Sequence, residues 1–254
     1  MLKVTVYSSS FEFIKIAKKI FTVVKVFTDK LPSTSLKVWC KKNSLNLNYI
    51  KNKKEFNLKN KIKTKSDIGL SFGFSIIFNN NDINDFKLGI WNFHTGDLPK
   101  YQGRHPITYA FLNNEKKIAL SIHKIDTKID RGYLLYKKFV KRSERDTEKE
   151  IIQKIIKIIP NGILNSIKNY NNNKLKKIKK GKYYPPLYNG IKIDDSKKVT
   201  QKYIYNSIMA QKIYNGVLIN NHRYVDAYYG QRNLKNWERL VCKNNKILYC
   251  LKKK

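Results

Sequence analysis

An asparagine and a histidine lie two residues apart, at Asn92 and His94, where an apolar run gives way to a loop rich in proline and glycine. If a strand continues through both positions, their side chains project to the same side, because side chains alternate along a strand. A second apolar run, residues 118–123, leads into an acidic loop that ends at Asp130. Polar groups gathered at the ends of adjacent strands commonly form the site of an α/β sheet.

These three side chains have complementary chemistry. The amide of Asn92 can donate an N–H to a developing oxyanion, an effect worth roughly 3–4 kcal/mol for one such donor. Histidine, with an ordinary pKa of about 6.5, is the natural group to handle a proton near neutral pH. Asp130 would pair with His94, favour its cationic form and organise a water for proton transfer.

The stretch at residues 91–134 resembles the folate-dependent formyltransferase family. The family's Asn-x-His pair, its Leu-Pro-x-Tyr-Arg-Gly-x-x-Pro loop and its Asp-x-x-x-Asp-x-Gly motif follow in order at residues 92–94, 98–106 and 126–132. The sequence departs from the family at Gln102, where arginine is usual, and at Asp97, where an apolar residue is usual. The first departure concerns a phosphate contact of the substrate, and neither concerns the Asn, His and Asp set.

The resemblance implies transfer of the formyl group of N10-formyltetrahydrofolate to an amine, with Asn92, His94 and Asp130 as the catalytic residues. It also implies that the folate pocket is lined by Phe72, Gly73, Phe74, Ile76, Ile125 and Asp126. Simple core packing of the apolar members, and a turn role for the aspartate, are the alternatives. His123 is interpreted as a residue that orders the loop, or as an ordinary histidine at a strand end.

Two further segments are candidates for contacts with the acceptor substrate. The turn Ser8, Ser9 and Ser10 precedes a predicted helix, where hydroxyls and a helix N-terminus suit a phosphate or a sugar, although an ordinary helix cap explains them equally well. The loop residues Lys100, Gln102 and Arg104 would border the acceptor according to the resemblance, and solvent exposure is the alternative for the lysine.

The elements that would position these residues form an α/β pattern. Strands are expected at residues 2–7, 21–27, 45–50 and 67–73, and helices at residues 11–20 and 35–42. This alternation predicts a Rossmann-like, mostly parallel sheet with helices on both faces, which is the formyltransferase fold that the resemblance implies. The lysine- and asparagine-rich residues 51–65 are expected to be a solvated surface stretch.

We expect two parts in the chain: a catalytic domain, residues 1–182, and a C-terminal region, residues 183–254. An extended run at residues 133–140 precedes a helix that Asp146 or Thr147 caps, with Glu150 completing a capping box. The lysine-rich residues 174–182 are read as a solvated linker, or as a binding patch. The remainder predicts a small α+β portion, with a helix at residues 202–213 and a closing β-hairpin around residues 243–246.

Composition limits the other classes of function. The net charge of +35 first suggests nucleic acid, but only seven of the 53 basic residues are arginine, which indicates the amino-acid bias of an AT-rich genome. Three scattered cysteines and four histidines give no disulfide framework and no metal signature. No apolar run is long enough for a membrane span or a signal peptide, so a cytoplasmic protein is expected. The serine turn contains no glycine, which argues against a dinucleotide cofactor.

The acceptor is inferred from the resemblance. We expect a nucleotide-linked amino-dideoxy sugar, such as a dTDP-linked 3- or 4-amino sugar destined for surface polysaccharide (O-antigen of lipopolysaccharide), and a homodimer formed through the C-terminal region. The alternative is a methionyl-tRNA formyltransferase with a shortened C-terminal domain, which the positive charge leaves open. From another class, a non-catalytic binding protein with this fold is opposed by the intact Asn, His and Asp set.

Overall fold

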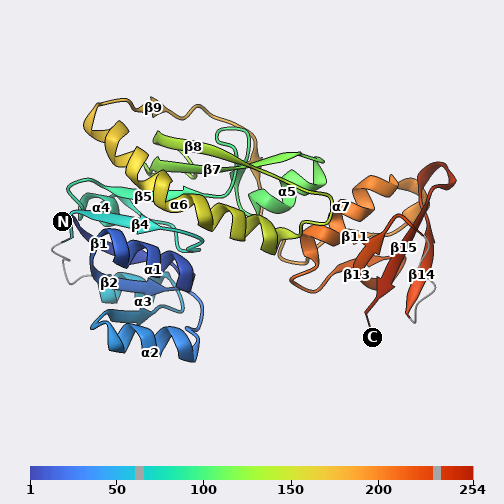
Figure 1. Cartoon of the computed structure of the whole chain (residues 1–254), viewed down its shortest axis with the longest axis horizontal. Coiled ribbons are helices and arrows are strands. Elements are labelled where there is room, and N and C mark those ends of the chain that lie inside the picture. Colours follow the sequence, from blue (N-terminus) through green and yellow to red (C-terminus); the bar gives the residue numbers. More distant parts are fainter. Residues whose placement is uncertain (61–65, 231–235, 254) are drawn as a thin grey trace. The chain divides into compact units, whose positions relative to one another are not determined.

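The computed structural model describes residues 1–60, 66–230 and 236–253 (Figure 1). The chain packs into two compact units, each assembled from three separate segments. The first unit comprises Met1–His94, Leu120–Lys138 and Ile156–Lys180, and the second comprises Thr95–Ala119, Phe139–Ile155 and Gly181–Lys254. The last crossing between units, after Lys180, lies close to the boundary at residue 182 that the sequence suggested; that boundary stays a prediction.

An eight-stranded sheet runs in the order β3-β2-β1-β4-β5-β7-β8-β9. Its strands are β1 (Lys3–Tyr7), β2 (Thr22–Thr28), β3 (Asn46–Tyr49), β4 (Ile68–Ser71), β5 (Ile90–His94), β7 (Lys117–Lys124), β8 (Tyr133–Lys141) and β9 (Lys176–Lys177). The four pairings from β3 to β5 are parallel, whereas β5 with β7 and β8 with β9 are antiparallel. The predicted α/β class is confirmed, and the sheet is mixed, with its parallel part N-terminal.

The helices of this part begin where the sequence offers caps. They are α1 (Phe11–Ile20), α2 (Thr34–Lys42), α3 (Lys53–Asn60), α4 (Asn80–Asn84) and α6 (Glu148–Asn171). The Ser10 hydroxyl accepts from the Phe13 N–H at the start of α1. At α6, Thr147 is the cap: its N–H donates to the Glu150 carboxylate at 2.8 Å, as a capping box requires. None of the described helices is long and apolar enough to span a membrane.

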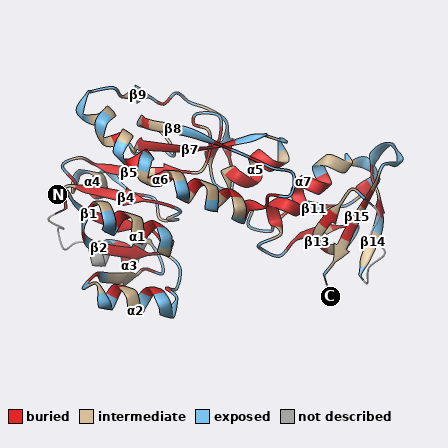
Figure 2. Cartoon of the chain, viewed as in Figure 1, coloured by how far each residue is buried: buried red, intermediate tan, exposed pale blue. Residues whose placement is uncertain are grey.

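The stretch at residues 51–65 was expected to be a solvated surface segment, and Lys51, Asn52, Lys54 and Asn57 are exposed. The sequence did not indicate the helix α3 at residues 53–60 or its one buried described side chain; residues 61–65 lie outside the described part. The side chain of Phe56 is fully buried, and its ring centroid lies 5.7 Å from that of Phe27 and 5.9 Å from that of Tyr7. Among the side chains of this helix that the structure describes, Phe56 is the buried one, and no apolar periodicity in the sequence indicates a helix here. Figure 2 shows buried strands beside the helices of the first unit.

The second unit contains a five-stranded sheet in the order β11-β12-β13-β15-β14. Its strands are β11 (Lys192–Ile193), β12 (Val217–Ile219), β13 (His222–Tyr228), β14 (Trp237–Val241) and β15 (Ile247–Lys252), and two short 3-10 helices, η1 (Ser196–Lys198) and η2 (Lys243–Asn245), accompany them. The antiparallel pair β14 and β15 confirms the predicted closing hairpin. The same unit contains α5 (Pro106–Leu112), α7 (Gln201–Gln211) and the short parallel pair β6 (Gln102–Gly103) and β10 (Tyr183–Tyr184).

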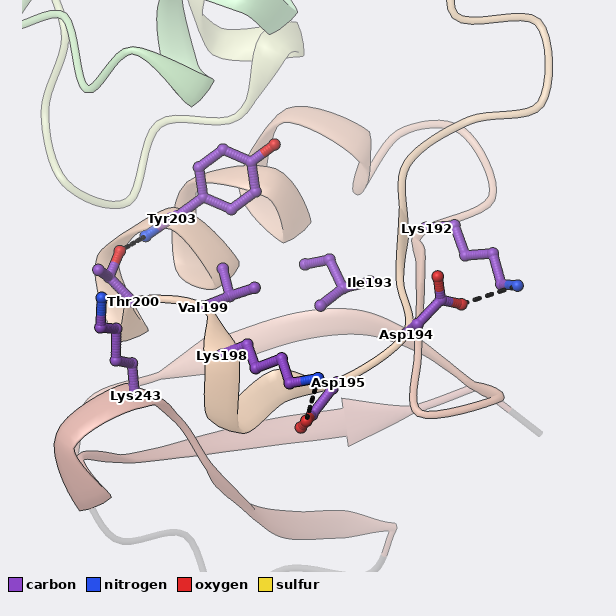
Figure 3. Close-up of a pocket in the computed structure, with 9 residues that line it drawn as sticks. All are labelled: Lys192, Ile193, Asp194, Asp195, Lys198, Val199, Thr200, Tyr203 and Lys243. Atoms are coloured by element: carbon purple, nitrogen blue, oxygen red, sulfur yellow. Dashed lines mark hydrogen bonds and ion pairs between the residues drawn. The ribbon is translucent and has the colours of Figure 1, made fainter.

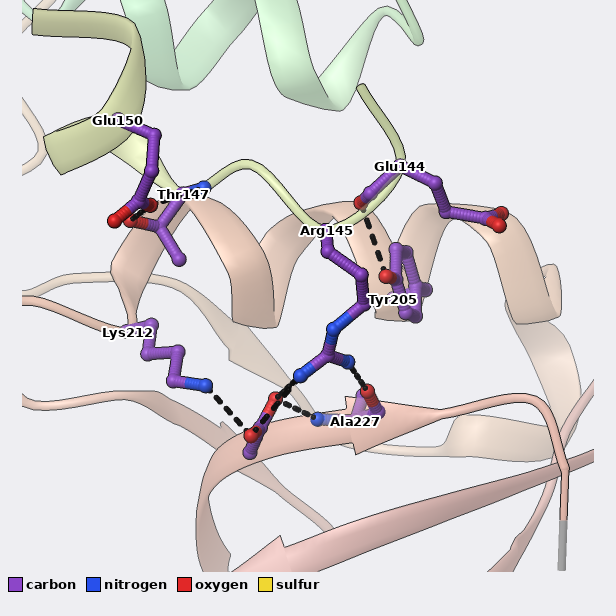
Figure 4. A network of polar contacts seen from close by, with 8 residues as sticks. Glu144, Arg145, Thr147, Glu150, Tyr205, Lys212 and Ala227 are labelled. Atoms are coloured by element: carbon purple, nitrogen blue, oxygen red, sulfur yellow. Dashed lines mark hydrogen bonds and ion pairs between the residues drawn. The ribbon is translucent and has the colours of Figure 1, made fainter. Parts of the chain in front are cut away.

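A polar network fastens the segment before α6 to the rest of the second unit (Figure 4). Arg145 Nη1 donates to the Ala227 carbonyl at 2.7 Å, and Arg145 Nη2 lies 3.3 Å from Asp226 Oδ1. Lys212 Nζ from the end of α7 reaches the same carboxylate at 2.6 Å. The Tyr205 hydroxyl donates to the Glu144 carbonyl at 3.0 Å. One carboxylate thus holds two cations, an arrangement that orders α7 and β13 together.

The lysine-rich residues 174–182 are more ordered than a linker. Lys176 and Lys177 form β9, which pairs with the start of β8 and leaves both lysine side chains exposed. Ile178 is buried, and its N–H donates to the Gly132 carbonyl at 2.9 Å. The charges are therefore solvated as expected, while one isoleucine anchors the segment to the first unit.

Candidate functional site

Asn92 and His94 lie on β5, and their register with β7 places them opposite His123 and Ser121. The His94 side chain is 7% exposed and the Asp130 side chain 10%, with His94 Nδ1 and Asp130 Oδ1 separated by 3.4 Å. The structure therefore brings together the three residues that the sequence singled out, all within the first unit. Asn92 and His94 lie at the end of β5, and Asp130 lies in the loop that follows β7, the antiparallel neighbour of β5.

The buried side chain of His123 completes this cluster. It is fully buried, its Nδ1 lies 2.9 Å from the Arg131 carbonyl oxygen, and its Nε2 lies 3.2 Å from Asn92 Nδ2. Burial is the main cause that lowers the pKa of His123 to about 4, so the ring is neutral at neutral pH. A carbonyl can only accept, so Nδ1 carries the proton and Nε2 accepts from the Asn92 amide. The loop-ordering interpretation of His123 agrees with this geometry.

This assignment fixes which way the amide of Asn92 faces. Its nitrogen must lie toward His123, because the imidazole Nε2 has only a lone pair to offer. One N–H of the Asn92 amide donates to His123 and fixes the side chain. The second N–H lies in the same amide plane, so its direction is fixed as well. A neutral, buried histidine thus serves as the orienting acceptor for a hydrogen-bond donor of the cluster.

The loop before Asp130 is tightly wound. Asp130 has a left-handed backbone, with φ of 50°, and Gly132 has φ of 93°. A Cβ on Gly132 would lie 2.0 Å from the Lys124 carbonyl oxygen, so only glycine fits there. Asp126 is exposed, and its carboxylate accepts the Lys128 N–H at 2.8 Å. That aspartate shapes the turn, which is the structural role considered for it.

The loop at residues 72–77 is held from three separate segments of the first unit. The Ser8 hydroxyl donates to the Phe72 carbonyl at 2.7 Å. Asp29 Oδ2 accepts the Ser75 N–H at 2.7 Å, and Lys53 Nζ donates to the Ile77 carbonyl at 2.9 Å. Sequence reasoning missed the last two anchors. Asp29 follows the end of β2, a position that favours function in α/β sheets, whereas nothing local marks Lys53.

The predicted apolar lining of the folate pocket is an apolar wall in the structure. Phe72 is 7% exposed, while Phe74, Ile76 and Ile125 are partly buried and pack against the buried aromatic cluster of the first unit. That cluster comprises Tyr7, Phe27, Ile50, Phe56, Phe78, Phe86 and Ile90. Gly73 has φ of 61°, and a Cβ there would meet nothing within 4 Å, so the backbone at this point borders open space.

The serine turn is bonded within the protein. Ser8 is fully buried, and its oxygen also accepts the Ser10 N–H at 3.1 Å. Ser9 donates its hydroxyl to Asp29 at 2.8 Å, and Ser10 caps α1. The helix-cap account therefore holds for Ser10, and the two other hydroxyls connect the turn to the loop at residues 72–77.

The predicted acceptor-loop residues belong to the second unit. Lys100, with a side chain that is 55% exposed, pairs with Glu115 at 2.5 Å. Gln102 is 5% exposed, and its Oε1 accepts the Gly181 N–H at 3.0 Å. Arg104 is exposed, and its backbone N–H donates to the Tyr184 carbonyl at 3.0 Å. Gln102, where the family usually has arginine, is therefore used to hold the chain at Gly181.

The described parts of the chain contain no group of three or more His, Cys, Asp or Glu side chains arranged to hold a metal ion. The polar cluster instead combines a directed amide, a histidine paired with a carboxylate and a neutral orienting histidine. Such a set can donate a hydrogen bond to a developing negative charge and can accept and pass on a proton.

Known proteins share parts of this sequence. A bifunctional polymyxin resistance protein, ArnA, from Wigglesworthia glossinidia brevipalpis is 36% identical over 93 residues, which is 37% of this chain and 14% of that protein. A methionyl-tRNA formyltransferase from Thermosipho melanesiensis is 28% identical over 167 residues, 65% of this chain and 54% of the relative. The chain therefore spans about half, or less, of the length of these relatives.

The fold is shared over the whole chain. An N-formyltransferase from Helicobacter canadensis, solved with folinic acid and dTDP-3-aminofucose, superposes with a TM-score of 0.72 at 21% identity, covering 100% of both chains. The sequence profile described as formyl transferase matches residues 22–167, which include the whole polar cluster. The chain belongs to the formyl transferase family.

Proposed function

We propose that this protein transfers the formyl group of N10-formyltetrahydrofolate to the amino group of a nucleotide-linked amino-deoxy sugar. The observation that carries the proposal is the cluster of Asn92, His94 and Asp130, in which His123 directs the amide and Asp130 pairs with the imidazole at 3.4 Å. Family membership supplies the class of reaction, and the cluster supplies the groups that it needs.

The residues of the chain divide the work. The Asn92 amide donates an N–H to the oxygen that gains negative charge, a contact worth roughly 3–4 kcal/mol of barrier. His94 has Nδ1 directed at Asp130, so Nε2 is the nitrogen that takes the proton of the attacking amine. Asp130 stabilises the imidazolium that results, and the near-complete burial of both side chains strengthens that attraction.

The formyl donor fits the apolar wall of the first unit. Bound N10-formyltetrahydrofolate would supply the formyl group, held by Phe72, Phe74, Ile76 and Ile125 and by the exposed backbone at Gly73. The open space above Gly73 and the partly exposed side chains of the loop suit a flat, ring-bearing ligand. The Ile125 N–H donates to the Ile90 carbonyl at 3.0 Å and its side chain packs against the same aromatic cluster, while the neighbouring Asp126 shapes the turn that follows.

A sugar amine is the acceptor that the comparisons favour. The Helicobacter canadensis enzyme matches the whole chain and was solved with a dTDP-linked amino sugar, whereas the tRNA enzyme of Thermosipho is matched over 54% of its length. Methionyl-tRNA remains the second candidate, because curated relatives of that kind match the sequence and the net charge is +35. Use of the product in O-antigen and assembly as a homodimer through residues 183–254 stay predictions.

The test is a formyl-transfer assay with N10-formyltetrahydrofolate on a panel of dTDP-, UDP- and GDP-linked amino sugars and on methionyl-tRNA. Turnover on one nucleotide sugar is the expected result, and the panel then identifies the base and the position of the amine. Turnover on tRNA alone, with tight and salt-sensitive tRNA binding, would replace the proposal by its second candidate. Absence of turnover on every acceptor would overturn both.

A further inference from the structure

The loop at residues 72–77 has a lysine anchor to which no part in the reaction has been assigned. Lys53 is the first residue of α3, and its Nζ donates to the Ile77 carbonyl, at the end of the loop, at 2.9 Å. The same Nζ lies 2.7 Å from Asp82 Oδ2, so one ammonium joins the loop to a carboxylate of α4. Because an ammonium has three N–H donors, it can make both contacts at once.

The carboxylate of Asp82 is fixed from its own side. It accepts the Asn79 N–H at 2.8 Å, and the Asp82 N–H donates to the Asn79 side chain at 2.9 Å, which completes a capping box at the start of α4. The side chain of Asp82 is 8% exposed, whereas that of Lys53 is 38% exposed. The aspartate is therefore a buried, oriented acceptor, and the lysine bridges from it to the loop.

The lysine side chain also lies against the aromatic cluster of the first unit. Lys53 Nζ is 4.7 Å from the centroid of the Phe56 ring, which lies about one turn further along α3. The Phe56 ring in turn contacts Phe74 of the loop, with ring centroids 6.1 Å apart. Helix α3 thus reaches the loop twice, through the ammonium at the loop backbone and through an aromatic ring at a loop side chain.

An exposed ion pair of the second unit shows what is particular to this lysine. Lys192 and Asp194, 2.8 Å apart, border a hollow of about 590 Å³ (Figure 3). Their side chains are 58% and 79% exposed, so their attraction is weak and screened by water. The pair of Lys53 and Asp82 differs because its carboxylate is almost fully buried and its ammonium also binds the backbone of a separate segment.

The anchor at Ile77 is one of three that fix the backbone of the loop. A serine hydroxyl holds the Phe72 carbonyl at the start of the loop, a carboxylate holds the Ser75 N–H in its middle, and Lys53 holds its end. The side chains of the proposed folate wall lie between these points. A group that fixes the backbone behind a binding wall affects binding without touching the ligand, because it keeps the wall in its binding geometry.

From these contacts we infer that Lys53, paired with Asp82, is a positioning residue for the formyl donor. The ammonium holds the Ile77 end of the loop, so the apolar wall is already formed when the donor arrives. Lys53 acts through the loop backbone and not on the reacting atoms. The inference rests on the proposed function for the identity of the donor. It assigns a role to a helix that lies outside the motifs at residues 92–132.

The test is calorimetric titration of the intact protein with folinic acid, a formylated folate, in the absence of any acceptor. Wild type is expected to bind it, and Lys53→Met to weaken the binding by about tenfold, the lower end expected for a hydrogen bond from a charged donor. Methionine keeps an unbranched side chain beside Phe56 and removes the ammonium. Lys54→Met, the same change at the exposed neighbour, is the matched control and should leave the affinity unchanged. Lys192→Met, which breaks the exposed pair, should do the same.

A second ligand separates positioning from direct attraction of the folate carboxylates. The pteroate analogue of folinic acid carries the same rings and formyl group without the glutamate. If Lys53 acts through the loop, Lys53→Met weakens this analogue by the same factor as folinic acid. Loss of the effect with the analogue would mean that the ammonium meets the glutamate carboxylates, and the inference would be wrong.

The pairing with Asp82 is tested by a double-variant cycle. Asp82→Asn removes the negative charge and keeps an oxygen that can accept the Asn79 N–H. The effects of Lys53→Met and Asp82→Asn on the affinity for folinic acid should not add, because both changes break the same contact. Additive effects would show that the two residues act independently and would overturn the pairing.

Turnover with N10-formyltetrahydrofolate gives a matching signature. In Lys53→Met the KM for the donor should rise by about tenfold while kcat stays close to wild type, since a positioning residue for the donor wall affects binding and not the chemical step. A fall in kcat at unchanged KM would contradict the inference. Thermal unfolding of each variant checks that the protein is folded at the temperature of the assay.

The outcomes separate this inference from the proposed reaction. Equal affinity of folded wild type and folded Lys53→Met for folinic acid would overturn the inference alone. If wild type does not bind folinic acid, the inference and the proposed donor are both wrong. Weaker binding by Lys53→Met, without formyl transfer to any acceptor, would support the inference and remove only the proposed reaction.

Discussion

Two regions of the first unit make an instructive comparison: the polar cluster of Asn92, His94, His123 and Asp130, and the aromatic cluster around Phe56 under the loop at residues 72–77. The polar cluster has few atoms and defined hydrogen bonds, and each member is directed by a neighbour. The aromatic cluster is a packed set of rings, and Phe74 and Ile76 of the loop pack against it. The first should control the rate of chemistry, and the second the stability and the binding of the donor.

The largest effect is expected from the polar cluster. Asn92→Ala, His94→Ala and Asp130→Ala should each lower kcat by at least about 100-fold, because each removes a group needed only as charge develops and protons move. Thermal unfolding should stay close to wild type. His222→Ala, an exposed histidine of β13, is the matched control for the histidine variant. Near-normal turnover in any one of the three would remove that residue from its assigned role.

The aromatic cluster should respond in the opposite way. Phe56→Ala should lower the free energy of unfolding by about 3 kcal/mol, since it empties a fully buried ring site. The folded protein should keep most of its kcat. Lys54→Ala, on the exposed side of the same helix, should change stability by less than about 0.5 kcal/mol. Equal stability of the two variants, measured by urea unfolding, would show that α3 does not dock on the core.

The pH dependence of stability sharpens the comparison within the polar cluster. The pKa of His123 is about 4 in the folded protein, below the ordinary value near 6.5 for an unfolded chain. Between these values the unfolded state binds the proton more readily, so stability falls as pH falls from 6.5 to 4 and is unaffected above. The expected loss between pH 7 and pH 5 is about 2 kcal/mol.

His123→Gln removes this titration. Urea unfolding of wild type and variant at both pH values isolates the histidine, because every other titrating group is common to the two proteins. The loss on acidification should be smaller in the variant by about 2 kcal/mol. A parallel pH dependence in both proteins would mean that the folded protein accepts a proton on His123 as readily as the unfolded chain.

A smaller effect is expected from the anchors of the loop. Asp29→Ala removes the acceptor of both the Ser75 N–H and the Ser9 hydroxyl, and should raise KM for the formyl donor by about tenfold. The value of kcat should change much less, because Asp29 does not belong to the polar cluster. Lys30→Ala, the exposed neighbour, is the control. An equal fall in kcat and kcat/KM would place Asp29 in the chemical step instead.

The sequence predicts features that depend on short local motifs, and it does not predict features that depend on contacts between distant residues. The residues of the polar cluster lie in short sequence motifs, so spacing and family resemblance are enough to identify Asn92, His94 and Asp130. Among the described side chains of α3 the buried one is Phe56, and the segment shows no periodic apolar signal. Gln102 shows the same limit, because its bond to Gly181 joins positions 79 residues apart.

The central claim is that this cluster performs formyl transfer to an amine. The most direct measurement is a single-turnover reaction with N10-formyltetrahydrofolate and the acceptor chosen by the panel, with product identified by mass spectrometry. Wild type is compared with the triple variant Asn92→Ala, His94→Ala, Asp130→Ala. We expect formylated product from wild type, and a rate at least about 100-fold lower from a folded triple variant, with effects that do not add beyond the worst single change. A triple variant within about tenfold of wild type would contradict the account, since the barrier would then be lowered elsewhere.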